Sequence, residues 1–118
     1  MPHFVIEYAR IVEETVDVVD VMEGVFEAAV QSEVMQAEDV KVRAIAYDHY
    51  RLYENKGNFI HVTVCLLQGR TDQQKERVAI EVRNCLAHLL PEISSISIDV
   101  RDMNPVAYKK RLLVNEAD

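Results

Sequence analysis

The sequence predicts an α+β fold of order βαββαβ, in which two βαβ halves form a four-stranded mixed sheet with two helices on one face. Two observations lead to this prediction. In two long segments the apolar residues recur every three or four positions, as on the buried side of a helix. Four shorter segments are rich in β-branched and aromatic residues, as strands are. Because 118 residues suffice for one such domain but not for two, we expect residues 1–118 to form a single domain.

The first half is predicted to contain a strand, a helix and a second strand. Residues 3–8 (HFVIEY) lack helical spacing and predict the first strand. The helix is expected from Val12 to about Val34, although Gly24 weakens it locally, and its predicted buried side consists of Val12, Val16, Val19, Met22, Phe26, Ala29 and Val30. The second strand lies within residues 39–54, where alternation places Val40, Val42, Ala44 and Ala46 on one face and Arg43, Ile45 and Tyr47 on the other.

The second half repeats this pattern. Polar residues 54–58 (ENKGN) predict a turn, and the apolar residues 59–68 (FIHVTVCLLQ) predict a strand that forms a hairpin with the preceding strand. Thr71 is the predicted N-cap of a helix that ends near Pro91 and whose apolar side consists of Val78, Val82, Leu86 and Leu89. Residues 95–100 (SISIDV) alternate as a last strand, and Asn104 and Pro105 begin a short terminal segment.

Charge and composition exclude several classes of function. A net charge of -7 without any block of basic residues argues against nonspecific nucleic-acid binding, because phosphates must be neutralised by Lys and Arg. The opening residues MPHFVIEYAR contain neither a signal peptide nor a membrane span, so we expect a cytoplasmic protein. Cys65 and Cys85 lie far apart in apolar patterns, which favours buried, reduced thiols over a disulfide.

Pro2 is the first residue that could carry chemistry. It is small enough for aminopeptidases to remove Met1, and its secondary amine would then be the amino terminus. Free α-amino groups have a pKa of about 8, and burial or a nearby cation lowers it, so such an amine could be neutral at pH 7 and accept a proton. If Met1 stays attached, the nitrogen is an amide and cannot act as a base.

The residues around Pro2 strengthen this hypothesis. The opening MPHFVIEYAR resembles the N-terminus of the 5-carboxymethyl-2-hydroxymuconate isomerase family of the tautomerase superfamily. Val42-Arg43-Ala44, FIHVTVCLLQGR and TDQQKERVAIEV resemble the corresponding segments of that family, in the same order. The element order alone also fits a ferredoxin-like sandwich, and this resemblance selects the tautomerase fold. It implies a homotrimer with catalytic Pro2 near a subunit boundary, without metal or organic cofactor.

The same resemblance assigns Arg43 and Arg70 to substrate binding. A guanidinium binds a carboxylate with two hydrogen bonds and stabilises the negative charge that develops on an enolate oxygen. Arg70 also lies in a Gly-Arg-Thr turn at the start of the second helix, where backbone N–H groups favour anions. The expected substrate is a small unsaturated 2-oxo or 2-hydroxy acid or diacid from aromatic catabolism.

Other functions remain open from the sequence. One is decarboxylation or hydration of a related oxoacid with protonated Pro2 as an acid, and another is a noncatalytic oligomer that binds a small anion or a protein. His49, His61 and Cys65 could approach one another as metal ligands, but packing within the sheet is favoured, and no metal is expected. His3 could tune Pro2 or line its pocket. Tyr47, Tyr50 and Tyr53 are expected to pack as an aromatic band.

Overall fold

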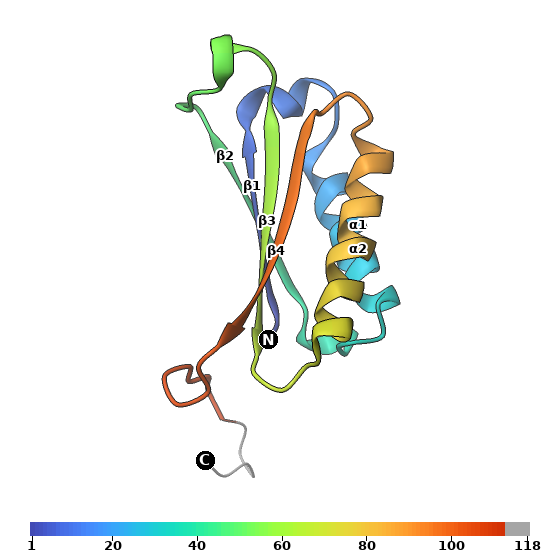
Figure 1. Cartoon of the computed structure of the whole chain (residues 1–118), viewed down its shortest axis with the longest axis vertical. Helices are drawn as coiled ribbons and strands as arrows, with labels where there is room; N and C mark the ends of the chain where they lie inside the picture. The colour runs from blue at the N-terminus through green and yellow to red at the C-terminus, as the bar shows by residue number, and fades with distance from the viewer. Residues whose placement is uncertain (113–118) are drawn as a thin grey trace.

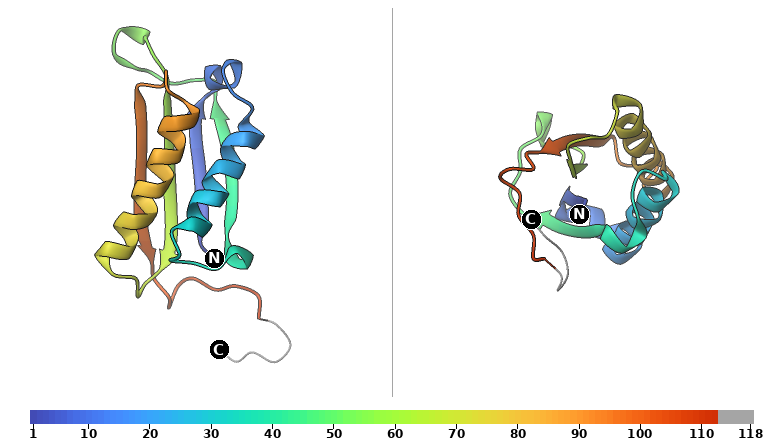
Figure 2. Two further views of the ribbon diagram at one scale, coloured as in Figure 1. Left: turned by 90° about the vertical axis from the view of Figure 1, so that its right-hand side faces the viewer. Right: turned by 90° about the horizontal axis from the view of Figure 1, so that it is seen from below.

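The computed structural model describes residues 1–112 of the chain and has the predicted element order. Its helices and strands are β1 (His3–Ala9), α1 (Val18–Gln31), β2 (Lys41–Tyr47), β3 (Phe59–Leu67), α2 (Asp72–Leu89) and β4 (Ser95–Met103). Both helices cover the same face of the sheet, with α1 beside α2 (Figures 1 and 2). The predicted α+β arrangement, with its four-stranded mixed sheet, is therefore confirmed.

The sheet has the order β2-β1-β3-β4, so the predicted hairpin between the second and third strands is wrong. β1 lies between them, parallel to β2 and antiparallel to β3, and β4 is parallel to β3. The distribution of apolar residues explains this order. The helix-facing side chains of β1 and β3 are large and almost fully buried, whereas those of β2 are smaller and only half-buried, namely Val42, Ala44 and Ala46. The two most apolar strands thus occupy the centre of the sheet.

The first helix begins later than predicted. Residues Arg10–Glu14 form a 3-10 turn, and α1 starts only at Val18, where the Asp17 side chain accepts a hydrogen bond from the Val19 N–H at 2.9 Å. Val19, predicted to be buried, is therefore in the first turn and 53% exposed. The most buried residues of α1 are Val21, Val25 and Ala28, which were not predicted, and Ala29, which was. Val16, Met22 and Phe26 are partly buried against the core, so the predicted side is confirmed in part.

The second helix matches its prediction. Thr71 is the N-cap, and it forms a capping box in which its hydroxyl accepts from the Gln74 N–H at 3.1 Å while the Gln74 side chain accepts from the Thr71 N–H at 2.9 Å. The helix ends at Leu89, two residues before Pro91. Val78, Val82 and Leu86 of this helix are fully buried.

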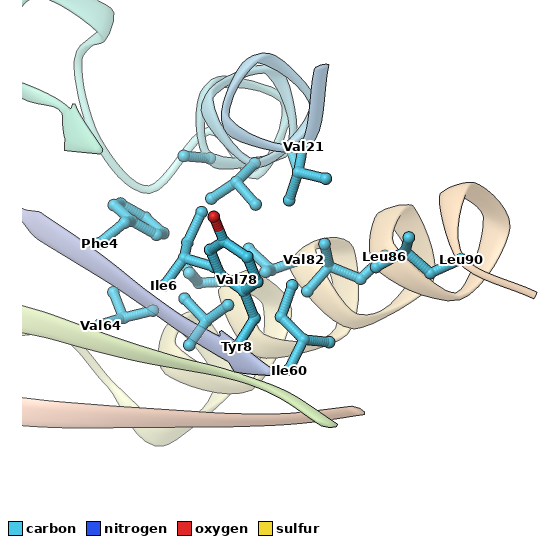
Figure 3. Packing of buried hydrophobic residues seen from close by; sticks show 14 of the residues in the cluster. Phe4, Ile6, Tyr8, Val21, Ile60, Val64, Val78, Val82, Leu86 and Leu90 are labelled. Carbon is cyan, nitrogen blue, oxygen red and sulfur yellow. The ribbon is translucent and has the colours of Figure 1, made fainter. Parts of the chain in front are cut away.

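The core lies between the helices and the sheet, as Figure 3 shows. Across the central pair of strands Phe4 faces Val64 and Tyr8 faces Ile60, and α2 packs over them. Burial of each large apolar side chain contributes about 1.5–3 kcal/mol to stability. Gly24 permits the close approach of the two helices, because a Cβ at this position would lie 2.8 Å from the Cys85 Sγ.

The opposite face of the sheet is not covered by either helix, and we call it the open face. It carries the alternate residues of each strand, including His3, Glu7, Arg43, Ile45, Tyr47, His61 and Cys65. Cys65 and Cys85 are free thiols, as expected, but each is half-buried rather than buried. Within residues 1–112, no helix has the length and apolar character needed to cross a membrane.

Candidate active site

Pro2 lies at the end of the sheet where β1 and β2 both begin (Figure 1). Its side chain is fully buried, in alternation with Phe4 and Ile6 on the helix-covered side. The Lys41 N–H donates to the Pro2 carbonyl oxygen at 3.0 Å, and the Met1 amino group donates to the Asp39 carbonyl oxygen at 2.8 Å. Backbone hydrogen bonds to the start of β2 therefore fix both residues that precede β1.

This environment disfavours a positive charge on an amine. Partial burial, followed by the hydrogen bond and charge of Lys41, lowers the pKa of the Met1 amino group from 8.0 to about 6, although the charge of Asp39 opposes the shift. The Met1 amino group is therefore mostly neutral at pH 7.

Arg43 lies two residues into β2, with its side chain exposed on the open face. Its Nη1 is 3.1 Å from the Nδ1 of His3 on the neighbouring strand. Among residues 1–112, Arg10 and Arg101 form salt bridges with carboxylates, whereas Arg43 forms none. Its charge is thus available to an anion.

Arg70 follows β3, whose last residues lie at the same end of the sheet as the first residues of β1. It is half-buried, and its Nη1 donates to the Leu67 carbonyl oxygen at 3.5 Å. Like Arg43, it has no salt-bridge partner in the described part of the chain. The two arginines approach this end from different sides, Arg43 from the open face and Arg70 from the loop that leads to α2.

The structure adds Tyr108, a residue that sequence reasoning missed. Its hydroxyl is 3.0 Å from the Nε2 of His3, and the two rings pack edge to face with centroids 5.9 Å apart. Burial and the charge of Arg43 lower the pKa of His3 below 6.5. The signal for Tyr108 was weak: it is a single aromatic residue in a polar segment that follows Asn104 and Pro105.

The remaining candidate residues have structural explanations. His61 pairs with Ser97, with Nδ1 and Oγ 2.6 Å apart, and β1 separates its strand from the one that precedes His49. No group of three or more His, Cys, Asp or Glu side chains within residues 1–112 is placed to hold a metal ion. Tyr47 and Tyr50 both pack on Phe59, as an aromatic band should, but Tyr53 is 88% exposed and does not belong to it.

Comparison with known proteins identifies related molecules. The family model for 5-carboxymethyl-2-hydroxymuconate isomerase matches residues 2–112. No curated protein matches the sequence. A 5-carboxymethyl-2-hydroxymuconate isomerase from Deinococcus radiodurans R1 is similar in structure, with a TM-score of 0.82, 14% identity, and coverage of 93% of this chain and 88% of that chain.

Two other solved structures show the same fold. Pt0534 inactivated by 2-oxo-3-pentynoate has a TM-score of 0.76 and 16% identity, over 92% of this chain and 91% of that chain. A wild-type fused 4-OT asymmetric trimer has a TM-score of 0.70 and 16% identity, also over 92% of this chain and 91% of that chain. The tautomerase fold that the sequence predicted is therefore confirmed.

Proposed function

Since this chain belongs to the 5-carboxymethyl-2-hydroxymuconate isomerase family, and is thus an isomerase of the tautomerase type, we propose that it moves a proton by means of Pro2 within a small unsaturated 2-oxo or 2-hydroxy diacid such as 5-carboxymethyl-2-hydroxymuconate. The reaction needs no metal or organic cofactor. Pro2, freed of Met1, takes a proton from one position of the substrate and returns it to another carbon. The base is regenerated in each cycle, so the reaction is a net isomerisation.

The strongest support for Pro2 as a base is the lowered pKa of the amine next to it. The Met1 amino group, one residue away, has a pKa of about 6. Pro2 is more buried than Met1, and its carbonyl oxygen accepts from the backbone N–H of Lys41, the residue whose charge lowers the pKa of the Met1 amine. Burial and a neighbouring cation both stabilise a neutral amine, so we expect the prolyl nitrogen to remain a base at pH 7.

Arg43 and Arg70 bind the substrate's carboxylate and carbonyl oxygens in this proposal. Both guanidiniums lack a carboxylate partner within residues 1–112. Arg43 is the third residue of β2 and Arg70 follows the end of β3, so both residues belong to the end of the sheet where β1 begins. As negative charge develops on the enolate oxygen of the dienol intermediate, an arginine beside it lowers the energy of the transition state. The substrate is therefore expected to be a small anion.

We expect the active unit to be a homotrimer. The open face carries apolar and aromatic side chains that neither helix covers, with Ile45 53% and Tyr47 36% exposed. A second copy of the sheet would bury them. The fused 4-OT that shares the fold is a trimer. In such an assembly the end that carries Pro2 lies near a subunit boundary.

The alternative is a noncatalytic protein that binds a small anion through the same arginines. It is favoured if Met1 is retained, because the Met1 amine already has a partner in the Asp39 carbonyl oxygen and the Pro2 nitrogen is then an amide. Intact mass of the untagged protein decides whether Met1 is present. Ketonisation of simple dienols then measures turnover.

Covalent labelling tests directly whether Pro2 carries a free, reactive amine. 2-Oxo-3-pentynoate inactivates the structurally similar Pt0534, and a free prolyl amine can add to its electrophilic triple bond. Loss of Met1, turnover that is lost in Pro2→Ala, and a label mapped to Pro2 by peptide mass are the expected results. Retained Met1 with neither turnover nor label contradicts the isomerase mechanism and supports the anion-binding alternative.

A further inference from the structure

We propose that Tyr108 is a substrate-binding residue, and that His3 is a positioning residue which connects Tyr108 to Arg43 in a single hydrogen-bonded unit for one carboxylate of the substrate. This inference rests on the proposed isomerase function and adds a binding residue from the C-terminal segment. The distances that define the unit are 3.1 Å between Arg43 Nη1 and His3 Nδ1, and 3.0 Å between His3 Nε2 and Tyr108 Oη.

The chemistry of the three side chains fixes the direction of these hydrogen bonds. A guanidinium has donors but no acceptor, so the Nδ1 of His3 accepts and carries no proton. In a neutral imidazole the proton is then on Nε2, which donates to the Tyr108 oxygen. The hydroxyl proton of Tyr108 is left without an acceptor in this unit. Tyr108 and Arg43 therefore both present donors that an anion can accept.

The position of Tyr108 is also fixed by its own segment. Its backbone N–H donates to the Asn104 carbonyl oxygen at 2.9 Å, and the Val106 N–H donates to the Asn104 side-chain oxygen at 2.9 Å. This turn directly follows β4 and brings the ring to the open face beside His3. In the single chain Tyr108 is half-buried and Arg43 is exposed, so a ligand can reach both. Ile45 and Tyr47, which the proposed trimer buries, lie further along β2.

The charges that face His3 favour its neutral form and an anionic ligand. Lys41 and Arg43 come from β2, the amino terminus lies beside β1, and Cys65 faces His3 from β3 with Arg101 next to it on β4. Burial first, and then Arg43, the amino terminus and Lys41, lower the pKa of His3. Among the described residues no carboxylate forms a hydrogen bond or salt bridge with His3, Arg43 or Tyr108. A substrate carboxylate would supply the missing negative charge.

Ring nitrogen NMR of the full chain tests the hydrogen-bond direction without any need for turnover. At pH 7.5, about one unit above the ordinary histidine value, the ¹⁵N shifts of His3 should report an unprotonated Nδ1 and a protonated Nε2. The opposite tautomer, or a doubly protonated ring at this pH, overturns the inference.

Binding of adipate, a saturated dicarboxylate that cannot tautomerise, tests the role of Tyr108. Tyr108→Phe should weaken adipate binding about tenfold, as expected for loss of one hydrogen bond to a charged acceptor, and should raise the substrate KM more than it lowers kcat. Tyr50→Phe is the matched control, because Tyr50 is partly exposed and packs on Phe59 at the other end of the sheet, after β2. Unchanged adipate affinity in Tyr108→Phe overturns the inference.

Two substitutions of His3 distinguish a role in positioning Arg43 and Tyr108 from a purely structural role. In His3→Asn the amide oxygen can still accept from Arg43, whereas His3→Leu removes both hydrogen bonds. Adipate affinity should therefore fall less in His3→Asn than in His3→Leu, and equal losses contradict a positioning role. Failure of the proposed function can be distinguished from failure of this inference. A protein that binds adipate through Tyr108 but shows no Pro2-dependent turnover has the inferred binding unit and lacks the proposed reaction.

Discussion

The backbone N–H of Lys41 donates to the Pro2 carbonyl oxygen at 3.0 Å, one residue before β1 begins. The sheet thus holds Pro2 by its carbonyl group and leaves its nitrogen outside the ladder of hydrogen bonds. A prolyl nitrogen carries no hydrogen when it is part of a peptide bond, so it has no role as a donor in the fold. Its chemistry can therefore be changed while the strand stays in place.

Replacement of Pro2 by Ala should lower kcat by about 10²-fold, within the range that a positioned general base contributes. Alanine leaves a primary amine after removal of Met1, without the ring that fixes the direction of the lone pair. Steady-state kinetics with a dienol substrate measure the effect. An unchanged circular dichroism spectrum is the control for folding, and an unchanged kcat contradicts Pro2 as the base.

The pH profile of kcat/KM should show that the Pro2 amine stays neutral well below pH 8. A protonated amine cannot act as a base, so kcat/KM falls as the pH falls through the pKa of Pro2. Because the Met1 amine at this end has a pKa of about 6, we expect the acidic limb below the ordinary amine value of 8.0. A limb centred near pH 8 would contradict this environment.

Lys41→Gln should move that acidic limb to higher pH, because Lys41 is one cause of the lowered amine pKa. Lys56→Gln is the control, since Lys56 lies in the loop between β2 and β3 and forms a salt bridge with Glu54. The kcat/KM profiles of the two variants are compared at constant ionic strength, because salt screens exposed charges. Equal profiles would show that Lys41 has no influence on the base.

Arg43→Gln and Arg70→Gln should each lower kcat/KM by about tenfold or more, the usual effect of losing one charged hydrogen bond to a ligand. Arg83→Gln, on an exposed position of α2, is the matched control. Kinetics with a diacid substrate and with its monoacid analogue would show which arginine holds which carboxylate. If Arg83→Gln has the same effect as the other two, the loss reflects net charge rather than a binding site.

Gly24→Ala should lower the free energy of unfolding by about 1 kcal/mol. Alanine gains up to about 1 kcal/mol in helix propensity, but overpacking costs about 1–3 kcal/mol. The added Cβ would lie 2.8 Å from Cys85 Sγ and 2.9 Å from Leu89 Cδ1. Urea denaturation measures the change. Adding Cys85→Ala should recover part of the loss, and strict additivity of the two substitutions would contradict the contact.

Ile45→Lys should shift the protein from trimer to monomer, because it places a charge on the open face. Val19→Lys is a close control, since both side chains are 53% exposed and Val19 lies on the helical side of the molecule. Sedimentation velocity distinguishes the species. If Val19→Lys dissociates the protein and Ile45→Lys does not, the interface lies on the helices.

The local sequence pattern predicted the helices and strands well, but it did not predict which strands lie next to each other in the sheet. The Thr71 cap and the strand within residues 59–68 depend on nearby residues, and both predictions are confirmed. The expected hairpin failed because strand order depends on which strands bury the most apolar surface, a property of the whole sheet. The buried side of α1 was predicted only in part, because the helix begins at the Asp17 cap and not at Val12. Val19 is exposed in the first turn, whereas Val12 and Ala29 are buried as predicted.

The candidate site, like the fold, could be predicted only where it depends on residues close together in the sequence. Pro2, Arg43 and Arg70 could be proposed from sequence because they lie in recognisable segments, and their roles stay predictions. The contact between His3 and Tyr108 joins residues 105 positions apart, so no local pattern could indicate it. His3 itself was a candidate without a known partner.

The connectivity β1-α1-β2 is repeated by β3-α2-β4, and the two units meet at the antiparallel pair of β1 and β3. Such an arrangement is what duplication and fusion of one ancestral unit would produce. Asn58, the residue before β3, then corresponds to Pro2 before β1, but its nitrogen lies within the chain and can never be a free amine. On the proposed mechanism a chain of two such units therefore carries one base. The second unit supplies no base, and its part in the reaction would be binding, through Arg70.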